Sequence, residues 1–444
     1  MTDSGLFRKA LWCYTAALSF LLISCSNTSK FYRDVDENIS NGNYPGAITD
    51  VRQNRNLYGD KSSVLFNLDM GTLFHYAGEY DSSIGYFFTA EKEIEDLYTK
   101  SISQQVLSLV VNDNILPYDG EDFEKVLINV FLALDYAKKG MTDDALVEAR
   151  KVDLKLREYA RQYDDKNTYK EDAFIRYIAG ALYESAGEIN DAFISYRNSY
   201  EAYENYSNEY GTPAPGFLLD DLVRTATLMS FTDEVDKYQS LGGQPYNIGE
   251  KPEGSIIVLT YTGKCPIKMQ EKPTVSIPDY SGVLHTFQIA LPKFTPRYRG
   301  NANYEITAIS NSDSVRTTTE LAENITAIAE KSLDDRLALI YLKSGGRALL
   351  KFLAAEKMKS EMKKARNETN NFLGSLAIDL IVGATEQADL RGWRTLPAQI
   401  QIARLSMPPG EYDLRVNESG NLLKTDSVNV QPGKTCFVIV NDVH

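Results

Sequence analysis

The sequence predicts a multidomain α+β protein, with an α-helical first half and an antiparallel, strand-rich second half that carries inserted helices. Three observations support this prediction. Residues 121–160 read as two amphipathic helices joined by a turn at Gly140, because apolar side chains recur there every three or four positions. A similar turn recurs at three other glycines in the first half. After residue 253, short runs of β-branched and apolar residues alternate with proline and glycine turns, which is typical of an antiparallel sheet.

The repeated turn has the pattern Gly-x-x-x-x-(Ala/Ser)-(Ile/Leu/Phe), and each copy follows one amphipathic segment and begins another. The four glycines are Gly42, Gly78, Gly140 and Gly187. Their intervals of 36, 62 and 47 residues exceed the 34 residues of a tetratricopeptide repeat. The first half therefore resembles a tetratricopeptide array with insertions. An irregular helical domain whose turns share a glycine by chance is the alternative.

The composition changes once along the chain and suggests where domains divide. We expect a helical repeat domain over residues 31–240 and a turn-rich linker over residues 241–252. A β-rich domain would then occupy residues 253–444, with a helical insertion at about residues 321–384. The second half of that insertion includes a basic stretch. From Lys343 to Arg366, eight Lys or Arg residues stand against two Glu, a pattern that suits anionic lipid, an acidic partner or simply a solvated helix face.

Residues 1–24 have the pattern of a lipoprotein signal peptide. Arg8 and Lys9 precede an apolar run over residues 11–23, which is too short to span a bilayer. The run ends in Leu-Ile-Ser-Cys at Cys25, which resembles a bacterial lipobox. The resemblance implies cleavage before Cys25 and acylation of that cysteine, and two or more acyl chains give stable anchoring. An ordinary secretory signal is the alternative.

The lipobox also predicts where the protein resides. Residues 25–30 would be the lipidated cysteine and a short tether, which would hold the repeat domain close to the membrane. In the sorting rule known for such lipoproteins, a serine after the cysteine, here Ser26, permits export to the outer membrane. We therefore expect a lipid-anchored protein of the bacterial cell envelope, with the outer membrane facing the periplasm preferred over the inner membrane.

Charge and motif content argue against nucleic-acid binding and catalysis. The 444 residues carry a net charge of -14, whereas neutralising phosphates needs a basic surface. The three histidines, His75, His285 and His444, lack metal-ligand spacing, and no phosphate loop or Gly-x-Ser-x-Gly motif occurs. We expect no enzyme activity, no catalytic residues, no metal and no cofactor. Cys265 and Cys436 remain after signal removal and lipidation, and they are either a disulfide or two buried thiols.

Five tyrosines share one face of the helix predicted at the end of the repeat region. Tyr196, Tyr200, Tyr203, Tyr206 and Tyr210 follow one another at steps of 4, 3, 3 and 4 residues. Such a stripe can stack on sugars or grip an extended peptide, which makes it a candidate partner-binding surface. The polar residues on the opposite face favour the other interpretation, in which the stripe packs against a neighbouring helix.

Residues 383–404, with the sequence GATEQADLRGWRTLPAQIQIAR, are the most distinctive stretch. They resemble the C-terminal signature of an uncharacterised bacterial family of tetratricopeptide-containing lipoproteins, as do residues 111–114, 117–121 and 143–150. The resemblance implies no known biochemical activity. It also implies a gene neighbourhood that includes a lipoprotein activator of a peptidoglycan synthase.

Side chains of this signature segment are candidates for a recognition pocket, because Arg and Trp are favoured binding anchors. An ion-pair cluster that locks the inserted helix to the sheet is the alternative. The candidates are Glu386, Asp389, Arg391, Trp393, Arg394 and Arg404.

These features together predict a membrane-anchored, non-enzymatic scaffold that binds envelope proteins, with cell-envelope or peptidoglycan assembly as the expected process. The expected partners are one or more envelope proteins, with membrane contact through the lipid anchor and none with nucleic acid. The alternative function is an envelope glycan-binding module that uses the tyrosine stripe between Tyr196 and Tyr210.

Overall fold

The computed structural model describes residues 30–101, 114, 116–162, 169–248, 253–278, 284–298, 300, 302–310, 314–364 and 387–444. The predicted signal peptide, Cys25, Glu386 and the end of the predicted helical insertion, residues 365–384, lie outside the described residues. The first half is helical. After a helix over residues 30–40, it contains α2 (Tyr44–Gln53), the short 3-10 helices η1 (Arg55–Leu57) and η2 (Asp60–Ser62), α3 (Ser63–Tyr76), α4 (Tyr80–Ser101), α6 (Asp122–Lys138), α7 (Thr142–Gln162), α8 (Ala173–Ala186), α9 (Ile189–Tyr210), α10 (Phe217–Leu228) and α11 (Thr232–Ser240).

The four predicted glycine turns are confirmed. Gly42, Gly78, Gly140 and Gly187 all have positive φ angles, between 67° and 86°. A residue with a side chain is strained in this left-handed region, so glycine ends one helix and permits a sharp reversal. Helices α2, α4, α7 and α9 each begin two residues after one of these glycines. The left-handed conformation at these four glycines thus produces successive antiparallel helix pairs.

The second half is strand-rich, which confirms the α+β fold class. Its elements are β1 (Gly254–Lys264), β2 (Ile267–Glu271), β3 (Thr274–Pro278), β4 (Leu284–Gln288), β5 (Leu291–Thr295), β6 (Tyr304–Ile309), β7 (Ser314–Thr318), β8 (Glu320–Glu323), α12 (Ile325–Lys364), β9 (Pro397–Met407), β10 (Gly410–Glu418), β11 (Asn421–Val430) and β12 (Thr435–Asp442). One four-stranded sheet has the order β12-β1-β9-β8 and a second has the order β11-β10-β6-β7. Strands β1 and β12 pair in parallel, whereas the other described pairs are antiparallel.

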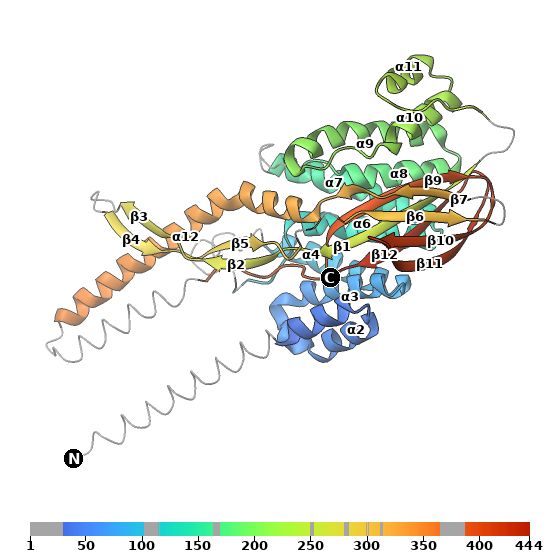
Figure 1. The fold of residues 1–444 in the computed structure, drawn as a ribbon. Coiled ribbons are helices and arrows are strands. Elements are labelled where there is room, and N and C mark those ends of the chain that lie inside the picture. The colour runs from blue at the N-terminus through green and yellow to red at the C-terminus, as the bar shows by residue number, and fades with distance from the viewer. Residues whose placement is uncertain are drawn as a thin grey trace.

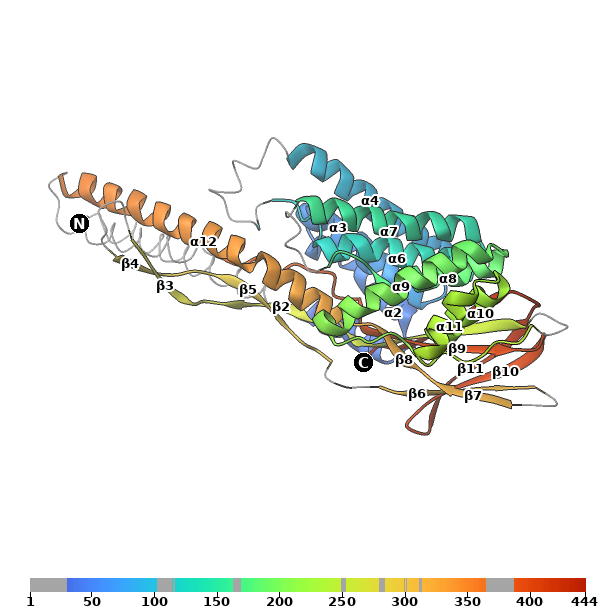
Figure 2. The same ribbon diagram turned by 90° about the horizontal axis from the view of Figure 1, so that it is seen from above.

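The molecule has three layers, with the β12-β1-β9-β8 sheet in the middle (Figures 1 and 2). Helices cover one face of this central sheet and the β11-β10-β6-β7 sheet covers the other. Alternate residues of a strand point to opposite faces. Accordingly, Leu259 and Tyr261 of β1 belong to the core shared with the helices, and Ile256 and Val258 belong to the core shared with the second sheet.

The two halves of the chain share one hydrophobic core. The described helices of the first half end at Ser240 and the first strand begins at Gly254, on either side of the predicted linker. Yet the cluster that contains the helix residues also contains Ile257 of β1, Ile402 of β9 and Phe437 of β12. The division into domains over residues 31–240 and 253–444 stays a prediction. Because the two parts share a core, we expect each to need the other for its stability.

Helix α12 forms an arm that projects from the three layers (Figures 1 and 2). Asn324 caps its N-terminus, because the side-chain Oδ1 accepts the Ala327 N–H at 3.1 Å. Ile325, Ile328 and Leu333 are buried in the core. Beyond Leu333 the helix runs outward beside the β2–β5 and β3–β4 ribbons, and its 40 residues span about 60 Å. Within the described part of the chain, no helix has both the length and the apolar character needed to cross a bilayer.

Candidate functional site: a basic cleft beside the signature segment

The predicted residues of the signature segment do not converge on one pocket. Arg391 and Arg394 line an open cleft, whereas Trp393 lies in the core. Arg404 lies in strand β9 and its guanidinium pairs with carboxylates of the helical layer. The expectation that all of them form a single recognition pocket is therefore wrong for Trp393 and Arg404.

Trp393 joins the signature segment to the helices. Its side chain is 2 % exposed, and the indole N–H lies 2.8 Å from Thr72 Oγ1 and 3.1 Å from Thr395 Oγ1. The ring packs against Phe87 of α4 and Phe131 of α6, with centroid distances of 5.6 and 5.7 Å. A side chain held on every side in this way stabilises the packing of the signature segment on the helices, and it is not available to an external partner.

Arg404 forms a buried ion-pair cluster with the last helices. Its guanidinium lies 2.9 Å from Glu184 of α8 and 3.1 Å from Asp221 of α10, and it donates to the Tyr196 hydroxyl at 2.8 Å. Burial raises the pKa of Glu184, but the cations of Arg404 and Arg224 outweigh burial and hold that pKa well below its usual range. The alternative interpretation of an ion-pair cluster applies here, although it joins β9 to α8 and α10 rather than to α12.

Asp389 and Arg391 form a second ion pair, in which Arg391 lines the cleft. The two side chains approach to 2.6 Å, and Arg391 also donates to the Leu116 carbonyl at 3.0 Å. The guanidinium lies 5.2 Å from the centre of the Tyr118 ring, within cation–π range. These contacts orient the signature segment against the loop before α6, so the Arg391 side chain is held in one orientation where it lines the cleft.

The cleft has a volume of about 580 Å³ and lies where three segments meet. One wall is the helix over residues 30–40, the second is strand β2, and the third is the signature segment over residues 387–394. Four cationic side chains line it, in a protein whose net charge is -14. They are Lys268, Lys272, Arg391 and Arg394. The remaining lining includes the amides of Asn114, Gln270 and Gln387 and the aliphatic side chains of Ile267, Met269 and Leu390.

Arg394 is the cation held closest to the N-terminal helix. Its guanidinium stacks 4.0 Å from the centre of the Tyr32 ring and lies 3.7 Å from Asp36. Its Nε atom is buried and has no hydrogen-bond partner among the described residues. Lys272 is exposed at the other end of the lining, and the described residues include no acidic partner for it. The cleft therefore keeps cationic capacity that internal ion pairs do not use.

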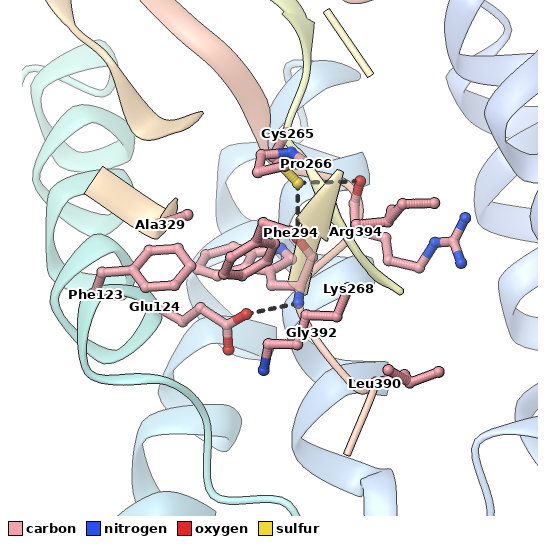
Figure 3. Close-up of a pocket in the computed structure, with 12 residues that line it drawn as sticks. Phe123, Glu124, Cys265, Pro266, Lys268, Phe294, Ala329, Leu390, Gly392 and Arg394 are labelled. Atoms are coloured by element: carbon pink, nitrogen blue, oxygen red, sulfur yellow. Dashed lines mark hydrogen bonds between the residues drawn. The ribbon is translucent and has the colours of Figure 1, made fainter. Parts of the chain in front are cut away.

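A small cavity of about 30 Å³ adjoins the cleft, shares lining residues with it and forms its floor (Figure 3). Its lining includes Glu124, whose carboxylate accepts the backbone N–H of Trp393 at 2.7 Å and the Tyr118 hydroxyl at 2.6 Å. Burial raises the pKa of Glu124. Beside it, Lys268 pairs with Glu121; burial raises the pKa of Glu121, but Lys268 and Arg336 outweigh burial and lower it to about 2. The volume suits about one water molecule, so a ligand would bind above this floor.

Cys265 lies in the same floor but is a poor nucleophile. Burial raises the pKa of its thiol to about 11, against the opposing effect of Arg297. The reactive thiolate is therefore scarce near neutral pH. Cys265 and Cys436 are both free thiols. Cys436 lies opposite Ile256 in the sheet, and Cys265 follows the far end of β1. About 30 Å of strand therefore separates the two cysteines. A disulfide needs Cα atoms within about 7 Å, so these two residues do not form one.

A buried histidine joins the helices to the central sheet. His75 of α3 lies 2.5 Å from Asp135 of α6 through Nδ1 and 2.8 Å from the Tyr261 hydroxyl of β1 through Nε2. All three side chains are fully buried, at 0–1 % exposure, and they line neither the cleft nor its floor. Sequence reasoning did not single out this network, because its members lie 60 and 186 positions from His75.

The tyrosine stripe is packed rather than displayed. Tyr196, Tyr203, Tyr206 and Tyr210 are at most 6 % exposed, and Tyr200 is half-buried. The Tyr203 hydroxyl donates to the Ala322 carbonyl at 3.0 Å, which connects α9 to β8. The stripe therefore meets the sheet and the adjoining helices, which agrees with the packing interpretation and shows that the other expectation, a partner-binding surface, is wrong for the buried rings.

One set of described residues has the composition of a metal site. Glu418, Asp442 and His444 place three ligand atoms within 4.8 Å of one another. The Asp442 carboxylate already accepts the Tyr304 hydroxyl at 2.5 Å and lies 2.6 Å from His444 Nε2. These contacts engage Asp442 and His444 with partners inside the chain.

Sequence reasoning also missed two cations and one aromatic ring of the cleft. Lys268 and Gln270 of β2 and Lys272 just beyond its end stand at alternate positions, which was a readable signal of a shared face. Tyr32 carried no such signal, because its role depends on Arg394, which is more than 300 positions away.

Comparisons with known proteins do not assign a family. No family model and no curated protein matches the sequence. Among solved structures, the apo form of RapI is similar with a TM-score of 0.33 and 14 % identity, over 45 % of this chain and 48 % of that chain. BtubC from P. vanneervenii is similar with a TM-score of 0.34 and 12 % identity, over 56 % of this chain and 94 % of that chain. The chain thus spans about half the length of RapI.

Proposed function

We propose that this chain is a non-enzymatic scaffold of the bacterial cell envelope, anchored by Cys25, whose basic cleft holds an acidic segment of a partner protein. The observation that carries the proposal is the gathering of Lys268, Lys272, Arg391 and Arg394 around one open cleft in an acidic protein. Cationic and guanidinium groups bind carboxylates through charge-assisted hydrogen bonds. The cleft offers this chemistry without a nucleophile or general base positioned beside it among the described lining residues.

The shape of the cleft favours an extended peptide segment. Strand β2 pairs with β5 along one edge, and among the described residues no other strand pairs with it. Residues 267–270 of β2 line the cleft consecutively. A partner strand can therefore lie along β2 and reach the exposed side chains of Met269 and Lys272, as in recognition by strand addition.

A pull-down from solubilised envelopes tests the proposal. The wild-type chain is expected to recover discrete envelope proteins, and Lys272→Glu combined with Arg394→Gln is expected to lose them, because the cleft then loses cationic charge. Lys293→Glu is the matched control. Lys293 lies on β5 of the same ribbon, is exposed, and is outside the cleft, so recovery should be unchanged. Equal recovery by the cleft variant and the wild type would refute the cleft assignment.

The anchor is tested separately. Cys25→Ala is expected to release the protein from the membrane or to block processing. Unchanged membrane retention together with unchanged mature mass would contradict lipidation at Cys25.

The glycan-binding alternative loses its proposed surface, because the tyrosine rings that it requires are packed in the core. Sedimentation of the chain with purified peptidoglycan, undiminished in the cleft variant, would restore a glycan reader that uses another surface.

A further inference from the structure

The outer part of α12 exposes an apolar surface that the described residues do not cover. Leu339 is 50 % exposed, Tyr341 is 42 % exposed and Leu342 is 72 % exposed. Leu339 and Leu342 lie three residues apart and therefore on one side of the helix. On the adjacent ribbon, Met269 of β2 and Leu284 of β4 are also more than half exposed. Large exposed apolar side chains concentrated on a projection mark a site of interaction.

The charge of α12 changes sign along its length. Near the body, Glu330, Asp334 and Asp335 are acidic, whereas the outer part is strongly basic. From Lys343 to Lys364 the helix carries seven cations against two carboxylates. The cations are Lys343, Arg347, Lys351, Lys357, Lys359, Lys363 and Lys364. A basic helix with aliphatic and aromatic side chains has the chemistry that binds the interface of an anionic bilayer.

The N-terminus of the described chain lies at the root of this arm. Tyr32 lines the cleft together with Met269 and Lys272 of the β2 ribbon. Cys25 precedes Lys30 by five residues, and five residues reach at most about 17 Å. An acyl chain on Cys25 would therefore bring the lipid surface close to the root of the arm, within reach of a helix that projects outward from there.

We propose that the arm lies on an anionic lipid surface, with Leu339 and Leu342 in the interface and the basic end of α12 at the head groups. The arm then acts as a second membrane contact and fixes the orientation of the anchored protein, with the cleft held at the membrane-facing end. This proposal rests on the proposed anchoring for its place in the cell, but the lipid contact itself needs no acyl chain.

Vesicle sedimentation of a chain without acyl groups tests the contact. The chain is residues 25–444 with Cys25→Ser, and the probes are vesicles of phosphatidylethanolamine with phosphatidylglycerol and vesicles of phosphatidylcholine alone. We expect sedimentation with the anionic vesicles, weakened by salt, and little with the neutral ones. Leu339→Ser with Leu342→Ser is expected to lower partitioning about tenfold or more, because two interfacial side chains are lost.

Val147→Ser with Leu154→Ser is the matched control. These aliphatic residues of α7 are 46 % and 59 % exposed and lie on the helical layer, away from the arm, so partitioning should not change. Lys357→Glu with Lys359→Glu should weaken binding to anionic vesicles, and circular dichroism verifies that each variant is folded.

Equal binding to both kinds of vesicle, an unchanged arm variant, or no binding at all would each overturn the proposal. Loss of an envelope protein from the pull-down in the arm variant, without vesicle binding by the parent chain, would assign the surface to a protein instead. Because this chain carries no lipid, its result is independent of the Cys25→Ala experiment.

Discussion

The two faces of the central sheet are built differently. The face toward the second sheet is largely aliphatic, with Ile256, Val258, Ala403, Leu405 and Val440 among its buried residues. The face toward the helices combines aromatic rings with buried polar networks. These networks centre on His75, Asp69, Trp393 and Arg404.

The difference shows how each interface obtains its specificity. Aliphatic contacts are non-directional, so several registers can bury similar area. A buried polar group instead needs its own partner, because leaving it unpaired costs about 1–3 kcal/mol, and more for a charge. On the helix side, Asp69 accepts the hydroxyls of Tyr58 and Thr395, so only one placement of the signature segment satisfies the carboxylate. The polar face therefore aligns the helical layer with the sheet.

The largest expected effect follows from separating the layers. If a protease site is engineered within residues 241–252, the nicked halves should remain associated in size-exclusion chromatography. Residues 253–444 expressed alone should lack cooperative unfolding, because Ile257, Leu259 and Tyr261 would face water. Cooperative thermal unfolding of the isolated 253–444 fragment would show that the aliphatic face alone sustains the sheet.

Arg404→Met breaks the ion-pair cluster of the polar face. The substitution leaves Glu184 and Asp221 with Arg224 as their remaining guanidinium partner, and we expect a loss of about 3–5 kcal/mol in urea unfolding. Arg415→Met is the matched control. Arg415 is exposed on β10, so its replacement should change stability by less than about 0.5 kcal/mol. Similar losses in both variants would mean that the buried pair has no special role.

The tyrosine stripe offers a test at the same interface. Tyr203→Ala and Tyr206→Ala each remove a ring that is 1 % exposed, and each should cost about 3–5 kcal/mol, seen as a clear drop in melting temperature. Tyr98→Ala, which removes a ring 53 % exposed on α4, serves for comparison and should have little effect. Melting temperatures unchanged by both stripe substitutions would make the stripe a binding surface after all.

The smallest expected effect is a pH dependence that arises from the polar face. Burial raises the pKa of Asp69 to about 6, against the lowering effect of the Tyr58 and Thr395 hydrogen bonds, and burial likewise raises the pKa of Asp172 to about 6. These folded-state pKa values exceed the unfolded value of 3.8, so the folded protein binds protons more readily. The free energy of unfolding should therefore rise as pH falls from about 6 to about 4, by up to about 3 kcal/mol for Asp69.

Asp69→Asn should reduce this gain, as measured by urea unfolding at a series of pH values. Glu121, with its lowered pKa of about 2, acts in the opposite direction and only below about pH 4.5. Asp413→Asn on the exposed side of β10 is the control and should leave the profile unchanged. A profile for Asp69→Asn that matches the wild type would contradict the assignment.

Much of the local structure could be predicted from the sequence. The glycine turns at Gly42, Gly78, Gly140 and Gly187 follow from the left-handed conformation that glycine tolerates. The spacing of the tyrosines predicted their shared face, and the polar opposite face of α9 predicted that they would pack. Each of these predictions needed only the helical period and the chemistry of neighbouring residues, so local information was sufficient.

The assembly of the layers was decided by tertiary structure. Strand β1 is apolar at successive positions, so its sequence predicts burial on both faces but does not say which face meets the helices. Its parallel pairing with β12 joins residues about 180 positions apart, and the cleft joins Tyr32 to Arg394. The basic cleft and the buried clusters of Trp393 and Arg404 arise from such distant contacts. Their partners are selected by the desolvation cost of polar groups in a packed core, which no local pattern in the sequence records.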